Sequence, residues 1–176
     1  MLSSGHVRSQ DASVCSRGSD TTNPLVRRVV DRPQTRDGGL PLALAMSRDT
    51  DHLPLVYSCS GCSSAGQLSN HLAVRLDRAG HAEMSCIAGV GGNVPSLARK
   101  AVNAAQTGRP IVGIDGCALA CVRSSLAQHG IEPAVHVQLG EHGVRKEHHV
   151  DFSKAQAESL YEYLKRRVEA ITVWMR

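Results

Sequence analysis

The chain has 176 residues, of which 41% are hydrophobic, and this is enough for one domain with a real core. Its formal net charge of +4 arises from 20 basic and 16 acidic residues, and the basic residues form only short groups, which argues against a nucleic-acid-binding surface. No apolar run approaches the roughly 20 residues that cross a bilayer, and the first residues lack the pattern of a secretory signal. We therefore expect a cytoplasmic protein that does not associate with a membrane.

The first 50 residues differ in composition from the rest. They are rich in Ser, Arg, Asp, Thr and Gly and show no sustained period of 2 or 3.6. This composition predicts a disordered or loosely packed tail over residues 1–50, followed by one domain over residues 51–176. Because the regular pattern starts just after Met46, we also hypothesise that the natural start of the protein lies downstream of residue 1. Cys15 lies in the tail and is interpreted as an incidental thiol.

From residue 53 onward, strand-like and helix-like segments alternate. We predict strands at residues 53–58, 82–87, 111–114 and 134–139; the first is apolar without alternation, which suits a strand covered on both faces. Helical periodicity predicts a helix at 64–79, for which Ser64 provides the cap, and another at 95–105. A third helix, which turns Leu119 inward, is predicted to end at Gly130, and a long one starts after Ser153, which caps it. This order predicts a small three-layer, Rossmann-like α/β domain with a mostly parallel four-stranded sheet and a long C-terminal helix.

Five cysteines lie where the first three predicted strands end. Cys59 and Cys62 follow the first strand, Cys86 closes the second, and Cys117 follows the third, with Cys121 one helical turn later. Because the carboxyl ends of parallel strands meet at one edge of a sheet, we expect these thiols to share one rim. In a reducing compartment, clustered cysteines are more often metal-binding or catalytic than disulfide-bonded. The sequence therefore predicts a thiol-lined site.

Three kinds of chemistry fit such a site. Four thiolates hold Zn²⁺ in a tetrahedral arrangement, as in proteins that handle metals or sulfur. The same ligands accept an iron–sulfur cluster. The spacing of Cys59 and Cys62 also fits a thiol redox or sulfur-transfer enzyme, with Cys59 as the nucleophile and Cys62 as the resolving thiol. The residues alone do not choose among these alternatives.

Other polar motifs receive simpler interpretations. Asp115 is predicted to cap the helix that follows it or to support the site. The segment from Gly89 to Gly92 is predicted to form a tight turn beside the cysteines, because no Lys-Ser/Thr pair follows it as in a phosphate loop. His142, His148 and His149 are predicted to be exposed to solvent. No Ser, His and acid trio occurs at a nucleophile elbow, so hydrolase chemistry is not supported.

The three cysteine motifs together resemble a known family. The Asp-Gly-Cys motif at 115–117 with Cys121, the segment 59–67 and the segment 84–92 resemble the DGC-domain family, which is regarded as a zinc-binding family of prokaryotes. The resemblance covers roughly residues 53–152. It implies a zinc ion as the cofactor. Separately, the two edge strands of the sheet need cover, by the tail, the last helix, or a protein partner such as a second subunit. The ligands that the resemblance implies are Cys59, Cys86, Cys117 and Cys121, whereas the C-x-x-C spacing favours Cys62, so the fourth ligand stays open.

Overall fold

The computed structural model describes residues 50–173, so the predicted tail lies outside the described part of the chain except for Thr50. Strands and helices alternate through these residues, as predicted. In chain order they are β1 (Leu55–Ser58), α2 (Ser64–Arg78), β2 (Glu83–Met84), α3 (Ile87–Gly91), α4 (Pro95–Gln106), β3 (Ile111–Asp115), α5 (Cys121–Ala127), β4 (Val135–Gln138), the 3₁₀ helix η1 (Leu139–His142) and α6 (Lys154–Val173).

The four strands form one parallel sheet in the order β2-β1-β3-β4. Leu55 of β1 lies opposite Ile111 of β3, so the two inner strands start at the same level of the sheet. Every residue of β1 and β3 is buried, because helices cover both faces of the sheet. This cover explains why both strands are continuous apolar runs rather than alternating ones.

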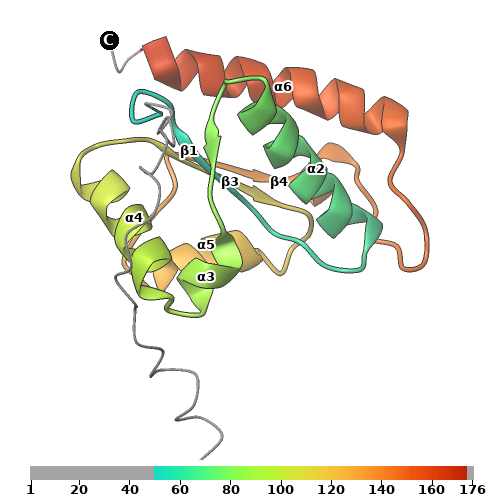
Figure 1. The fold of residues 1–176 in the computed structure, drawn as a ribbon. Helices are drawn as coiled ribbons and strands as arrows, with labels where there is room; N and C mark the ends of the chain where they lie inside the picture. Colours follow the sequence, from blue (N-terminus) through green and yellow to red (C-terminus); the bar gives the residue numbers. More distant parts are fainter. Residues whose placement is uncertain (1–49, 174–176) are drawn as a thin grey trace, which may run out of the picture. The chain divides into compact units, whose positions relative to one another are not determined.

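Helices α2 and α6 lie on one side of the sheet, and α3, α4 and α5 lie on the other (Figure 1). Val56 of β1 belongs to the core beneath α2 and α6. Its neighbours Leu55 and Tyr57 point the other way, into the core shared with α4 and α5. The predicted three-layer α/β arrangement, with a parallel four-stranded sheet and a long C-terminal helix, is therefore confirmed.

The second strand is shorter than predicted, because only Glu83 and Met84 pair with β1. The chain then turns into α3, so the glycine segment at 89–92 forms mostly helix and the predicted tight turn is wrong. A side chain at Gly89 would overlap Leu97, which shows why glycine is needed there. Gly89 therefore lets α3 pack closely against α4, and Gly91 lets it pack closely against Ser125 of α5.

The starts of two helices also differ in detail from the predictions. Ser63, not Ser64, caps α2, and its hydroxyl accepts a hydrogen bond from the Gly66 N–H. Helix α5 begins at Cys121, so Leu119 lies before it and is 69% exposed rather than packed in the core. The predicted cap of the last helix is confirmed, since the Ser153 hydroxyl accepts from the Gln156 N–H at 3.3 Å.

Candidate functional site

The strand order of the sheet reverses between β1 and β3, and the carboxyl ends of these two strands lie side by side at that point. From β1 the chain crosses to β2 on one side, whereas β3 pairs with the opposite side of β1. In open parallel sheets, this arrangement leaves a crevice beyond the strand ends in which ligands bind. Cys59 follows β1 directly, and Gly116 and Cys117 follow β3. The strand order therefore places cysteines from two separate motifs at one crevice.

A pocket of about 170 Å³ occupies this crevice, and four of the five predicted site cysteines line it. We call it the cysteine pocket; its lining includes Cys59, Cys62, Cys117, Cys121, Lys146 and His148. Cys86 does not line it. Cys86 lies instead in a second pocket of about 330 Å³ beyond β2, and Ser60 borders both pockets. Cys86 therefore lies next to the cysteine pocket, whereas the other four predicted site cysteines line it.

The loops that follow β1 and β3 are in close contact at the inner side of the cysteine pocket. The Gly116 N–H donates a hydrogen bond to the Cys59 sulfur at 3.1 Å. A Cβ atom at Gly116 would lie only 2.5 Å from the Ala65 carbonyl oxygen in the first turn of α2. Only glycine permits this approach, which explains the middle residue of the Asp-Gly-Cys motif.

Cys59 differs from the other thiols in its environment. It is 8% exposed, whereas Cys62 and Cys121 are exposed and Cys117 is partly exposed. Burial raises the pKa of the Cys59 thiol, and the hydrogen bond from Gly116 opposes this rise in part. A neutral, shielded thiol is a poor nucleophile, so the geometry favours Cys62 over Cys59 as the accessible thiol for any exchange reaction.

A segment far away in the sequence completes the cysteine pocket. Residues 145–148, which we call the strap, run along the start of α2. Ser64 donates its N–H to the Glu147 carbonyl at 2.9 Å and accepts the Glu147 N–H on its hydroxyl at 3.1 Å. Ser63 and His148 form an antiparallel bridge, which brings His148 Nδ1 to 3.8 Å from the Cys62 sulfur.

Sequence reasoning missed the two strap residues that line the pocket, Lys146 and His148. His148 is exposed, as predicted, but it lies beside a cysteine rather than facing solvent alone. The only available signal was that the strap follows β4, whose carboxyl end shares the rim with the other parallel strands. Its pairing with α2 uses the backbone N–H and C=O groups of the strap, which leave no mark in the side-chain pattern of residues 145–148.

Asp115 organises the other side of the site, and the predicted capping role is confirmed. Its carboxylate is 1% exposed and accepts the N–H groups of Val122 and Arg123, at 2.9 and 3.2 Å. The same carboxylate contacts His136 Nε2 on β4 at 2.9 Å. These bonds fix the first turn of α5, and Cys121 is the first residue of that helix. The position of Cys121 therefore depends on Asp115.

The donor types around the cysteine pocket suit a thiophilic metal, since four sulfurs and one imidazole nitrogen line it. In residues 50–173, however, no group of three His, Cys, Asp or Glu side chains is arranged to hold a metal ion. Metal binding would therefore draw the loops after β1 and β3 closer together. No helix in this part of the chain is long and apolar enough to cross a membrane.

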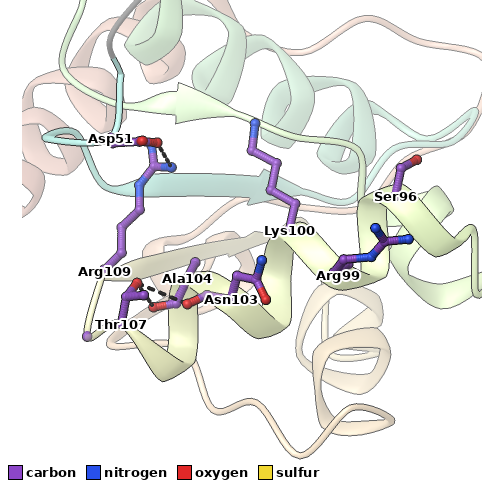
Figure 2. A pocket seen from close by; sticks show the side chains of 9 residues that line it. Asp51, Ser96, Arg99, Lys100, Asn103, Ala104, Thr107 and Arg109 are labelled. Carbon is purple, nitrogen blue, oxygen red and sulfur yellow. Dashed lines mark hydrogen bonds and ion pairs between the residues drawn. The ribbon is translucent and has the colours of Figure 1, made fainter.

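A larger pocket, about 800 Å³, runs along α4 and reaches Asp51 and Arg109 near the amino-terminal ends of the strands (Figure 2). Arg109 extends from the segment before β3 toward Asp51, and its guanidinium donates to the carbonyls of Leu53 and Thr50, each at 2.7 Å. It also pairs with Glu83 at 2.6 Å. Because these partners already use its donors, Arg109 ties strand ends together rather than offering a ligand site. The thiols make the smaller pocket the better candidate.

Comparison with known proteins agrees with the cysteine motifs. The family model for the DGC domain matches residues 55–164. The chain is 54% identical to the Anaerobic and virulence modulator AnvM of Pseudomonas aeruginosa over an alignment of 116 residues. This alignment covers 66% of this chain and 86% of AnvM. No solved structure gives a significant match. Because the family model matches more than half of the chain, the chain belongs to the DGC-domain family.

Proposed function

We propose that this chain is a metal-binding regulatory protein that holds zinc through thiolates at the crevice between β1 and β3. One observation carries the proposal: cysteines from two separate motifs line a single small pocket at the position where parallel sheets bind ligands. The proposed ligands are Cys59, Cys62, Cys117 and Cys121.

The surroundings of the pocket support thiolate ligands. The Gly116 N–H already points at the Cys59 sulfur, and such a bond stabilises an anionic sulfur more than a neutral one. Cys62 lies just before the first turn of α2, a helix of 15 residues whose amino end carries partial positive charge. Lys146 adds a positive charge at the rim. A site with four thiolates and one Zn²⁺ would have a net charge of −2, which these groups offset.

The choice of Cys62 over Cys86 rests on position. The resemblance to the DGC family implies Cys86 as a ligand, but Cys86 lies beyond β2, on the far side of β1 from β3. Cys62 lines the same pocket as the other three thiols. Zn–S bonds of roughly 2.3 Å need all four sulfurs around one point, which favours the thiol that is already there.

The test is anaerobic purification followed by elemental analysis of the wild-type chain and three single variants. We expect about one zinc per chain in the wild type, with loss of zinc in Cys62→Ser and Cys117→Ser. Cys86→Ser is the matched control and should keep its zinc. Loss of zinc in Cys86→Ser but not in Cys62→Ser would refute our ligand set and support the one that the family resemblance implies.

The same purification tests the alternative cofactor. An iron–sulfur protein would be brown and would contain iron and sulfide in place of zinc. A chain that contains neither metal nor sulfide, and that binds no added Zn²⁺, would refute the metal-binding proposal and leave thiol chemistry at Cys62 as the better explanation. Thiol alkylation of the zinc-loaded protein supplies a second readout, because bound thiolates react more slowly than free ones.

The regulatory part of the proposal rests on the relative from Pseudomonas aeruginosa, whose name describes a modulator rather than an enzyme. A four-thiolate zinc site has no open coordination position for a substrate, which fits such a role. We propose that metal binding sets the position of the strap and of the loop after β3, and that a protein partner recognises that state. Pull-down with and without zinc tests this step: a partner retained equally by both forms would refute it.

A further inference from the structure

Cys86 has a pocket of its own, which the proposed zinc site does not use. This Cys86 pocket, of about 330 Å³, lies at the carboxyl ends of β1 and β2 and is within the size range of small-molecule sites. Met84, Ile87 and Ala88 form its apolar part. Its polar groups are uncharged, and they belong to Ser58, Ser60, Asn70, Ser85 and Cys86.

One of these polar groups has no partner. Ser58 is 5% exposed, and its hydroxyl oxygen is buried without a hydrogen bond to any described residue. Ser58 lies two residues after Val56 on β1, so its side chain lies on the sheet face that α2 covers, the same face from which Asn70 of α2 lines the pocket. Leaving a buried hydroxyl unpaired has a cost in free energy, and a bound ligand would remove it.

We propose that the Cys86 pocket binds a low-molecular-weight, peptide-like thiol, which forms a mixed disulfide with Cys86. The exposed thiol supplies the bond, and the Ser58 hydroxyl and Asn70 carboxamide supply both donors and acceptors for amide groups of the ligand. The absence of charged side chains among the residues that line this pocket favours amides over phosphates or sulfate. The apolar wall accommodates the methylene groups beside the ligand sulfur.

The reaction is thiol–disulfide exchange with the disulfide form of the ligand. The Cys86 thiol loses its proton to solvent, and its sulfur attacks one sulfur of the ligand disulfide. A new S–S bond forms to Cys86, the ligand S–S bond breaks, and the second half leaves as a thiolate that takes up a proton. Cys86 is thereby oxidised and one half of the ligand disulfide is reduced, so the electrons balance without a further oxidant.

Glutathione disulfide is the probe for the test, applied to the full chain and followed by peptide mass mapping over time. We expect Cys86 to be modified faster than Cys62, although both thiols are exposed. Asn70→Ala and Ser58→Ala should each slow the modification of Cys86 about two- to tenfold, the effect of losing one hydrogen bond. Ser159→Ala, at an exposed position on α6, is the matched control and should leave the rate unchanged.

Two further measurements make the test specific. Hydroxyethyl disulfide lacks amide groups, so its reaction with Cys86 should not respond to Asn70→Ala. Ser58→Ala should fold and be at least as stable as the wild type, because it removes an unpaired buried hydroxyl. Equal modification of Cys62 and Cys86, or an equal response of both disulfides to Asn70→Ala, would overturn the proposal. The responses of Cys86 to the two variants do not depend on zinc, because the proposed zinc ligands are other residues. The comparison with Cys62 does depend on zinc, because zinc bound to Cys62 would slow that thiol, so this comparison is repeated after the zinc is removed by chelation.

Discussion

Replacing Gly116 with alanine tests whether close contact between the loop after β3 and helix α2 builds the cysteine pocket. The new Cβ would lie 2.5 Å from the Ala65 carbonyl oxygen and 3.0 Å from the Gly66 nitrogen, and both are backbone atoms that cannot rotate away. Relief of such overpacking costs about 1–3 kcal/mol. Separation of the loops would also lengthen the Gly116 N–H bond to Cys59, which contributes roughly 0.5–1.5 kcal/mol.

These two effects together predict a loss of roughly 1.5–4.5 kcal/mol in the free energy of unfolding. Urea denaturation measures this loss, provided that the slope of the transition stays constant. Gly140→Ala is the matched control, because its Cβ would meet only the Gln138 side chain at 3.6 Å, an ordinary contact. If Gly116→Ala were as stable as Gly140→Ala, the tight contact would not exist in solution and our account of the pocket would be wrong.

Three further outcomes are expected. Leu164→Ala, in the core beneath α6, should lower the free energy of unfolding by about 2–5 kcal/mol in urea denaturation, and an effect below 1 kcal/mol would contradict the packing of α6 on the sheet. Asp115→Ala leaves the buried N–H of Val122 and the partly buried N–H of Arg123 at the start of α5 without this acceptor and should destabilise by about 2–4 kcal/mol; unchanged hydrogen exchange at Val122 would contradict the cap. Burial raises the pKa of Glu83, but the hydrogen bonds from Lys100 and Arg109 outweigh it, so the folded pKa lies below the ordinary value. The stability that the Glu83 carboxylate provides is therefore present at pH values above its ordinary pKa and is lost as the pH falls through its pKa in the folded protein. Glu83→Gln should make the free energy of unfolding depend less on pH on the acid side, as measured by urea denaturation at several pH values. An unchanged pH dependence would refute this assignment.

The sheet and its helices could be predicted from the sequence because burial leaves a strong pattern. Continuous apolar runs such as 111–114 mark strands covered on both faces, and Leu68, Leu72 and Leu76 mark the inner face of α2. The second strand was over-predicted because the apolar residues at the two ends of segment 82–87 pack for different reasons. Ala82 packs in the core near the sheet, whereas Ile87 packs as the first residue of α3.

The grouping of the cysteines could be predicted only in part. Their position after the strands followed from periodicity, but the order of the strands did not. Sheet order β2-β1-β3-β4 puts β1 in the middle, so Cys59 faces Gly116 across one crevice and Cys86 lies across another. His148 was missed because hydrogen bonds between Ser64 and the backbone of the strap place it, and contacts of backbone groups across 83 residues have no sequence signature.

The loop after β3 has a consequence that reaches beyond the crevice. Asp115 holds the first turn of α5, and its neighbour Gly116 touches the first turn of α2, while these two helices cover opposite faces of the sheet (Figure 1). Asp115 and Gly116 thus contact the helices on both faces of the sheet. A displacement of this loop would tilt two helices at once, so a protein that contacts only one face could detect what happens at the rim.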